Sequence, residues 1–212
     1  MKVVIFDLDG TLLDTLDDLT ASVNHALCVN ALPQRTKQEV CSFVGNGIRR
    51  LIQLAVPTGT SDAITEQVFT DFRIHYLQHS LDRTQPYEGI PQLLKTLKAA
   101  GHRLAIVSNK AHEAVEALHR RFFADTVDLA LGETPQRQRK PAPDGILEAM
   151  RSLDASPDEV LYVGDSEVDV LTARRAGVRC VSVAWGFRDE ALLTSCKPDY
   201  LIHRPDELLP LL

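Results

Sequence analysis

The sequence has no long apolar run and little cysteine, and both shortages restrict what the protein can be. No stretch approaches the roughly 18 consecutive apolar residues that a membrane-spanning helix needs. The four cysteines show no Cys-x-x-Cys pair and no zinc-ligand spacing, which favours reduced thiols in a cytosolic protein. The amino terminus enters a predicted strand without a basic and apolar leader. We therefore expect no secretory signal and a cytoplasmic location.

The chain also lacks an excess of positive charge. Its formal net charge is −6, which argues against non-specific binding to nucleic acid or to acidic membranes. The seven histidines form no His-x-His or His-Glu-x-x-His arrangement, so we interpret them as ordinary surface or loop residues. No internal repeat or low-complexity tract is visible. What remains is a chain of 212 residues, 44% of them hydrophobic, sufficient for one large domain or one domain that carries an insert.

Short apolar runs alternate with segments of helical periodicity over most of the chain. This alternation predicts an α/β fold with a parallel, doubly wound sheet. The predicted strands are residues 3–6, 103–107, 127–131, 160–163 and 178–183, with an edge strand at 200–202.

Residues 15–85 interrupt this alternation, because their apolar positions follow a helical period throughout and β-branched runs are scarce. Thr15 and Asp18 fit a capping box at the start of the first helix of this segment. We therefore interpret Asp18 as a first-turn residue rather than a metal ligand. The predicted domains are a core of residues 1–14 and 86–212, and an all-helical insert of residues 15–85.

The first predicted strand leads directly into Asp7-Leu8-Asp9-Gly10-Thr11. Side chains two positions apart on an extended segment point the same way, so we expect Asp7 and Asp9 to face one point. Two carboxylates about 4 Å apart repel by roughly 4 kcal/mol at an effective dielectric constant near 20. Mg²⁺, which prefers oxygen ligands, would remove that repulsion. Gly10 permits a sharp turn whose N–H groups can face an anion, although an Asp-Gly pair that only ends a strand is the alternative.

Three more polar clusters stand at or near the ends of later predicted strands: Ser108-Asn109, Lys140, and Asp165 with Asp169. The carboxyl ends of parallel strands lie at one edge of a sheet, so we expect these clusters to converge on Asp7. Each cluster taken alone could be a helix cap or, for Lys140, a solvated loop residue. It is improbable that all of them have such an explanation, because each stands at or near a strand end. We expect Lys140 and Asp165 to lie within about 10 Å of Asp7.

These residue types suit phosphoryl transfer, which needs an aligned nucleophile, neutralised phosphoryl oxygens and a protonated leaving oxygen. One carboxylate can attack phosphorus to give an aspartyl-phosphate, and a second can carry the proton. A hydroxyl, backbone N–H groups and a lysine can hold the equatorial oxygens. Carboxylates together with Mg²⁺ complete the charge balance.

The four clusters, in this order, resemble the four motifs of the haloacid dehalogenase superfamily. The matching stretches are Asp7-Leu8-Asp9-Gly10-Thr11-Leu12, Ser108-Asn109, Lys140-Pro141, and Gly164-Asp165-Ser166 followed by Asp169. The resemblance covers nearly the whole chain. It implies a Rossmann-like core with strand order 3-2-1-4-5, flanked by helices, and a helical cap inserted after the first motif.

The resemblance also implies a role for each motif residue. Asp7 would be the nucleophile, and Asp9 would protonate the leaving alcohol and then activate water. Lys140 would stabilise the nucleophile and the transferring group. The residues that would contact the phosphorylated substrate are Gly10, Thr11, Ser108 and Asn109. Those that would bind Mg²⁺ are Asp7, the backbone carbonyl of Asp9, and Asp165. Asp169 would bind Mg²⁺ either directly or through another ligand.

The presence of Asp9 distinguishes between the reactions that members of this superfamily catalyse. The family pattern implies that dehalogenases and phosphonate hydrolases lack this second carboxylate, so its presence indicates phosphate-ester chemistry. The stretches 44–47, 86–89 and 106–110 resemble the phosphoglycolate phosphatase group. We expect a Mg²⁺-dependent phosphatase acting on a small phosphorylated metabolite, as a monomer or homodimer, with no nucleic-acid or membrane partner. A sugar-phosphate mutase, which shares both aspartates, stays open.

Arg49 and Arg50 follow a glycine loop on a predicted cap helix. Arginine binds carboxylates through two parallel hydrogen bonds, so we predict that one of them, assigned here as Arg49, contacts a substrate carboxylate. Two arginines on a solvated helix face are the alternative. Two other protein classes also stay open, a non-catalytic phosphate-binding regulator and a signalling receiver domain. The position of the acidic pair on the first strand and the long helical insert argue against the receiver.

Overall fold

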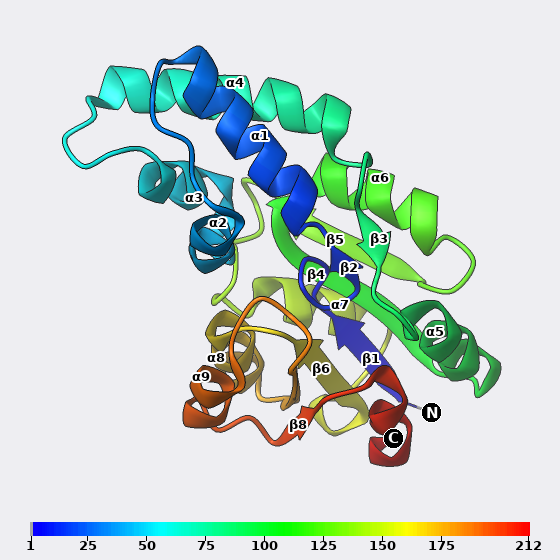
Figure 1. Ribbon diagram of the computed structural model, residues 1–212. Coiled ribbons are helices and arrows are strands. Elements are labelled where there is room, and N and C mark those ends of the chain that lie inside the picture. Colours follow the sequence, from blue (N-terminus) through cyan, green and yellow to red (C-terminus); the bar gives the residue numbers. More distant parts are fainter. Residues whose placement is uncertain (1) are drawn as a thin grey trace. The chain divides into compact units, whose positions relative to one another are not determined.

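The computed structural model describes residues 2–212. These residues form two compact units (Figure 1). One unit combines the residues up to Leu13 with Pro86–Leu212, and the other is Asp14–Gln85. Within residues 2–212, no helix is both long and apolar enough to cross a membrane. No disulfide joins the four cysteines, all of which lie in this part of the chain.

The first unit is built on a six-stranded sheet with the order β5-β4-β1-β6-β7-β8. Every neighbouring pair is parallel. The strands are β1 (Val3–Phe6), β4 (Arg103–Ala111), β5 (Leu129–Glu133), β6 (Val160–Gly164), β7 (Arg179–Val183) and β8 (Tyr200–Ile202). Numbered along the chain, the first five strands have the order 3-2-1-4-5. The predicted order is therefore confirmed, and the predicted edge strand pairs with β7.

Helices cover both faces of this sheet. They are α5 (Ile90–Ala99), α6 (His112–Phe122), α7 (Asp144–Ser152), α8 (Glu167–Ala176) and α9 (Glu190–Ser195), with the 3₁₀ helices η1 (Pro157–Glu159) and η2 (Pro205–Leu211). Val4 and Phe6 of β1 share one apolar cluster with residues of α5 and α6. Val3 and Ile5 share another with residues of α7 and α8. The central strand is thus buried on both faces, as its continuous apolar run predicts.

β4 is longer than the predicted strand 103–107, since it continues to Ala111. Its pairing with β5 shifts in register between Val107 and Ala111. Ser108 and Asn109 therefore lie inside an irregular part of the strand and not after its end. Such an irregularity redirects side chains that a regular strand would hold in alternation.

The second unit is helical, with α1 (Leu16–Val29), α2 (Lys37–Phe43), α3 (Gly47–Ala55) and α4 (Asp62–His79). On α4, Val68, Phe72 and Tyr76 are buried, whereas Ile64 is exposed. The two connections between the units, β2 (Leu13–Asp14) and β3 (Gln85–Pro86), pair as a two-stranded sheet.

The capping box predicted at Thr15 and Asp18 is wrong. Thr15 makes no side-chain cap hydrogen bond. The buried carboxylate of Asp18 instead accepts hydrogen bonds from the backbone N–H groups of Arg83 and Thr84, at 3.0 and 2.9 Å, and from the Thr84 hydroxyl at 2.9 Å. Three donors from a segment 65 residues away outcompete the local cap. Asp18 thus joins the start of α1 to the segment that follows α4.

Three histidines of this unit stack in a row, with ring centroids 4.1 Å apart for His25 and His75 and 4.2 Å apart for His75 and His79. Burial and the two neighbouring rings lower the pKa of His75. These residues lie on α1 and α4, where His25 is exposed and His75 and His79 are partly exposed, so they are surface residues as interpreted, although they also contact one another. Neutral rings can pack face to face here, whereas protonated rings would repel each other.

Candidate functional site

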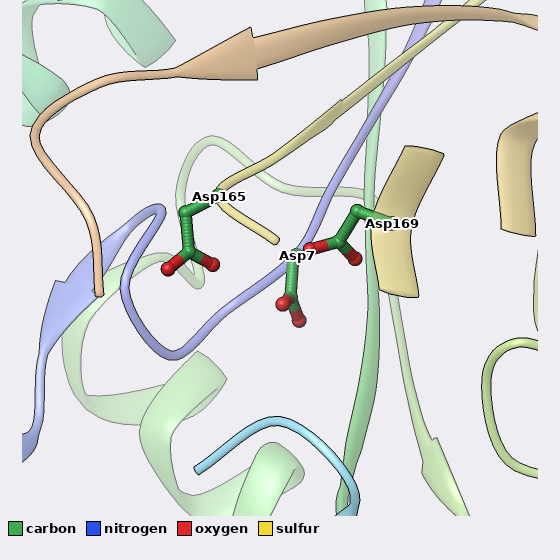
Figure 2. Close-up of side chains that lie close together, drawn as sticks. All are labelled: Asp7, Asp165 and Asp169. Atoms are coloured by element: carbon green, nitrogen blue, oxygen red, sulfur yellow. The ribbon is translucent and has the colours of Figure 1, made fainter. Parts of the chain in front are cut away.

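Three buried carboxylates gather at the carboxyl ends of two neighbouring strands (Figure 2). Asp7 follows β1, Asp165 follows β6, and Asp169 lies in the first turn of α8. One oxygen from each carboxylate lies within 4.8 Å of the other two. The topology therefore brings together three predicted metal ligands that are distant in sequence, and all three lie in the first unit.

The electrostatics of this acidic cluster favour a cation. Burial raises the pKa of Asp7 well above its usual range, and the charges of Asp169 and Asp165 raise it further against the attraction of Lys140. Burial, followed by the charge of Asp169, raises the pKa of Asp165 to about 7. Both shifts express the cost of concentrating negative charge away from water. A buried set of carboxylate oxygens at this spacing fits a hard divalent cation such as Mg²⁺.

Lys140 is a positive charge that the chain itself supplies to the cluster. Its Nζ lies 2.9 Å from Asp7 Oδ1 and 2.7 Å from Asp169 Oδ1. It also donates to the Tyr162 hydroxyl at 3.1 Å, and that hydroxyl donates to Asp169 Oδ1 at 2.9 Å. Burial lowers the pKa of Lys140, but the charges of Asp169 and Asp7 outweigh it and raise the pKa above its usual value. Lys140 is therefore held as an ammonium beside Asp7.

Tyr162 belongs to the site although sequence analysis did not identify it. It lies in β6 and is fully buried. A tyrosine in an otherwise apolar strand is compatible with ordinary core packing, so the sequence carried only a weak signal. The signal was its polar hydroxyl in a strand buried on both faces, since a buried hydroxyl needs a partner.

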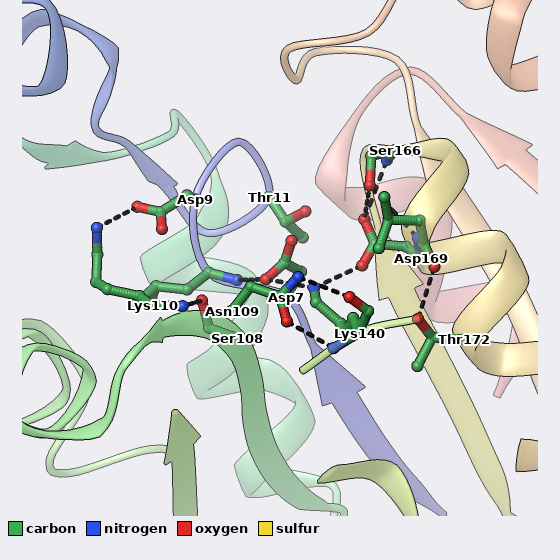
Figure 3. Close-up of polar contacts among 12 residues, drawn as sticks. Asp7, Asp9, Thr11, Ser108, Asn109, Lys110, Lys140, Ser166, Asp169 and Thr172 are labelled. Atoms are coloured by element: carbon green, nitrogen blue, oxygen red, sulfur yellow. Dashed lines mark hydrogen bonds and ion pairs between the residues drawn. The ribbon is translucent and has the colours of Figure 1, made fainter. Parts of the chain in front are cut away.

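Asn109 holds the backbone of Lys140 (Figure 3). Its side-chain oxygen accepts from the Lys140 N–H at 2.6 Å, and its amide donates to the Lys140 carbonyl at 3.0 Å. The hydroxyl of the neighbouring Ser108 accepts from the Lys110 N–H at 3.2 Å. Both predicted phosphate-binding residues are thus buried near Lys140, and Asn109 also positions it.

Asp169 is oriented by the start of α8. The Ser166 N–H and hydroxyl donate to Asp169 Oδ2 at 3.1 and 2.5 Å, and the Ser166 hydroxyl accepts from the Asp169 N–H at 3.4 Å. This capping box occupies one carboxylate oxygen and presents the other to Lys140. A Cβ on Gly164 would lie 2.3 Å from Asp169 Cγ, so only glycine fits beside it.

Asp165 is held between the first motif and the loop after β7. It accepts from the Phe187 N–H at 2.7 Å and from the Thr11 hydroxyl at 3.4 Å. A Cβ on Gly10 would lie 2.3 Å from Asp165 Oδ2, and one on Gly186 would lie 2.2 Å from Asp165 Cβ. The two glycines therefore make room for this carboxylate. Sequence analysis missed the loop at 186–187, whose contribution is a backbone N–H and the absence of a side chain.

The carboxylate of Asp9 lies apart from the acidic cluster. Its Oδ1 forms an ion pair with Lys110 Nζ at 3.1 Å. Figure 3 shows this pair at one end of the polar group and Asp169 at the other, with Asp7 between them. The expectation that the side chains of Asp7 and Asp9 face one point is therefore wrong. β1 ends before Asp7, and the chain turns at Gly10 with φ +84°, so the alternation of an extended strand does not apply.

Arg49 lies on α3 of the second unit. Its guanidinium pairs with Glu66 through two contacts, of 2.5 and 3.2 Å, and its Cζ lies 4.2 Å from the centroid of the Phe69 ring. The ion pair is about half exposed, at 53% and 56%. A substrate carboxylate would have to compete with Glu66 for this arginine. The predicted substrate contact of Arg49 stays a prediction.

A family model described as haloacid dehalogenase-like hydrolase matches residues 4–183. A phosphoglycolate phosphatase of Aquifex aeolicus is 32% identical over 213 residues, covering 100% of this chain and 97% of the relative. Phosphoglycolate phosphatase 1 of Pseudomonas aeruginosa is 33% identical, covering 99% and 79%. Pyrophosphatase PpaX of Bacillus cereus is 28% identical, covering 100% and 96%.

The fold is also found in solved structures. A crystal structure of a candidate phosphoglycolate phosphatase from Lactobacillus delbrueckii superposes with a TM-score of 0.91 at 32% identity, covering 98% of this chain and 97% of that one. The matched family model spans all four motifs. The chain therefore belongs to the haloacid dehalogenase-like hydrolase family, and its relatives identify it as a phosphatase.

Proposed function

We propose that this phosphatase hydrolyses a small phosphomonoester through an aspartyl-phosphate on Asp7, and that phosphoglycolate is its first candidate substrate. One observation supports the proposal above all others: the Asp7 carboxylate lies 2.9 Å from a buried ammonium and beside two further buried carboxylates. This is the arrangement of a nucleophile, a charge stabiliser and a metal site that phosphoryl transfer requires. The choice of substrate is supported by the names of the relatives.

Asp7 would act as the nucleophile. One of its oxygens, Oδ1, accepts from the Leu8 N–H at 2.7 Å and contacts Lys140, which fixes the orientation of the carboxylate. Attack forms a bond between an Asp7 oxygen and phosphorus while the bond from phosphorus to the leaving oxygen breaks. Lys140 remains beside the reacting oxygens as charge passes to the phosphoryl group.

Asp9 would move the protons. In the first step its carboxyl group gives a proton to the leaving alcohol. In the second step the carboxylate takes a proton from water, the water oxygen bonds to phosphorus, and Asp7 is released together with inorganic phosphate. Gly10, Thr11, Ser108 and Asn109 are proposed to contact the phosphoryl oxygens.

Mg²⁺ is the proposed cofactor. Asp7, Asp165 and the backbone carbonyl of Asp9 would hold it, with Asp169 as a ligand or as support for one. When bound, Mg²⁺ supplies positive charge to the phosphoryl oxygens. Two hydrogen bonds fix the direction of the Asp165 carboxylate. Its pKa is raised to about 7 because burial and the charge of Asp169 destabilise the anion, and a bound cation would offset that cost.

A phosphate-release assay tests the proposal. The purified protein is given phosphoglycolate, p-nitrophenyl phosphate and pyrophosphate, each with Mg²⁺ and with EDTA. Pyrophosphate is included because relatives 28% identical are named pyrophosphatases. We expect Mg²⁺-dependent turnover of phosphoglycolate that Asp7→Asn abolishes without loss of the fold. Turnover retained in Asp7→Asn would exclude the nucleophile role, and interconversion of sugar phosphates without phosphate release would indicate a mutase instead.

A net charge of −6 supports small metabolites as the partners of this protein, in place of nucleic acid or acidic membranes. We further propose a cytoplasmic location and a monomer or homodimer. Size-exclusion chromatography with light scattering measures the second of these directly.

A further inference from the structure

Lys110 makes a close contact that the four motifs do not explain. It lies in the irregular part of β4, directly after Asn109. Its side chain is only 5% exposed, and its Nζ lies 3.1 Å from Asp9 Oδ1, whose side chain is 16% exposed. An ammonium removed from water to this degree needs a charged partner. Asp9 supplies that charge, so the proposed proton-carrying carboxylate has a positive charge beside it.

The role proposed for Asp9 sets how far Lys110 can lie from the leaving oxygen of a bound substrate. To protonate the leaving oxygen, Asp9 must come within about 2.6–3.2 Å of it. Lys110 Nζ is 3.1 Å from Asp9. Where Oδ1 carries the proton, the ammonium therefore lies within about 6 Å of the leaving oxygen, by the sum of these two distances. A charged group one or two bonds beyond that oxygen lies in the neighbourhood of Lys110.

The two buried lysines of the site serve different ends of it. Lys140 contacts Asp7 and Asp169, on the side of the nucleophile. Lys110 contacts Asp9, the proposed acid for the leaving group (Figure 3). An ammonium has three N–H donors, so Lys110 can donate to Asp9 and to a second carboxylate at the same time. A positively charged leaving group would instead meet repulsion.

We propose that Lys110 makes this enzyme selective for phosphomonoesters whose leaving group carries a carboxylate. The inference rests on the proposed function, because it uses Asp9 as the acid for the leaving alcohol. It assigns the discrimination between leaving groups to a residue of the first unit. Arg49, the residue predicted from the sequence for this role, is already paired with Glu66 and is half exposed.

Three substrates of similar size and different charge test the proposal. Phosphoglycolate has an anionic leaving group, 2-hydroxyethyl phosphate a neutral one and phosphoethanolamine a cationic one. We expect the wild type to prefer them in that order by kcat/KM. Lys110→Met should lower kcat/KM for phosphoglycolate about 10- to 100-fold, mainly through KM, because one charge-assisted hydrogen bond is lost. The same change should alter the neutral substrate less than about threefold and raise turnover of the cationic one.

Two further variants make the result interpretable. Lys110→Arg keeps the charge and should keep most of the preference, which shows that charge and not packing is responsible. Lys98→Met removes a lysine that also pairs with an aspartate, Asp128, but in a partly exposed position away from the motifs. It should leave all three substrates unchanged. If Lys110→Met is poorly folded by circular dichroism, Lys110→Gln, which is polar and neutral, gives the same comparison.

Each other outcome has a definite meaning. An equal loss for all three substrates would show that Lys110 only positions Asp9, and the proposal would be wrong. An unchanged preference in Lys110→Met, or a wild type that turns over all three equally, would also overturn it while leaving the proposed function intact. A wild type that releases phosphate from none of the three, nor from p-nitrophenyl phosphate, would overturn both.

Discussion

Asn109 brackets the backbone of Lys140, accepting from its N–H at 2.6 Å and donating to its carbonyl at 3.0 Å, although 31 residues separate them. The two residues belong to different motifs, and both are buried. The ammonium that stabilises Asp7 therefore depends on an amide from the neighbouring strand. A buried side chain that satisfies both polar groups of one residue holds that residue in register.

The first prediction concerns this bracket. Asn109→Ala should lower kcat at least about 10-fold with a smaller change in KM, because Lys140 loses its position and two buried polar groups lose their partner. The free energy of unfolding should fall by about 1–3 kcal/mol. Steady-state kinetics and urea unfolding measure the two effects. A variant that changes KM alone would show that Asn109 contacts the substrate and does not hold Lys140.

The second prediction is a pH dependence of stability in the metal-free protein. The folded pKa of Asp165 is raised from 3.8 to about 7, so the folded state binds more protons than the unfolded chain between these values. The free energy of unfolding in EDTA should therefore fall as pH rises from about 4 to 7, by up to about 1.4 kcal/mol per pH unit for one proton. Thermal unfolding from pH 4 to 8 measures this slope.

Asp165→Asn provides the control for this slope, because it removes the titrating group at nearly constant shape. In EDTA at pH 8 the variant should melt at a higher temperature than the wild type, since a buried repulsive charge is gone. It should also lose the stabilisation that Mg²⁺ gives the wild type. An identical pH slope in both proteins would contradict the assignment to Asp165.

The third prediction uses two glycines with the same backbone conformation. Gly10 and Gly101 have φ of +84° and +83°, but an added Cβ would lie 2.3 Å from Asp165 at Gly10 and would meet nothing within 4 Å at Gly101. Both alanine variants should lose roughly 1–2 kcal/mol of stability from the left-handed conformation. Only Gly10→Ala should also weaken Mg²⁺ activation, by displacing the Asp165 carboxylate. Activity titrated with Mg²⁺ and urea unfolding separate the two effects, and equal Mg²⁺ dependence in both variants would contradict the contact.

The fourth prediction concerns the acidic pair at the start of α1. Asp18 is buried and accepts hydrogen bonds from Arg83 and Thr84, whereas the neighbouring Asp17 forms a half-exposed ion pair with Lys37. Asp18→Ala should cost about 2–4 kcal/mol, because several donors to a charged group lose their partner, while Asp17→Ala should cost under about 1 kcal/mol. Urea unfolding measures the difference. Limited proteolysis should cleave near Arg83 faster in Asp18→Ala only, and equal cleavage in both variants would contradict this anchoring role.

Local pattern was sufficient for the architecture of the first unit. A continuous apolar run, as in Val3–Phe6, identifies a strand buried on both faces, and alternating helices require a parallel sheet. Parallel strands place their carboxyl ends at one edge, so the convergence of Asp7, Lys140 and Asp165 follows from topology before any distance is known. The structure confirms it, with Lys140 2.9 Å from Asp7.

Which buried group pairs with which was decided only by tertiary structure. The sequence placed Asp9 beside Asp7 and Asp18 on Thr15, whereas the observed partners are Lys110 and Thr84. It also gave no sign that Asn109 holds the backbone of Lys140. Each observed partner comes from a segment far along the chain or from an irregular stretch of strand. Periodicity determines which face a residue occupies, whereas pairing depends on differences of one or two ångströms between segments that only folding brings together.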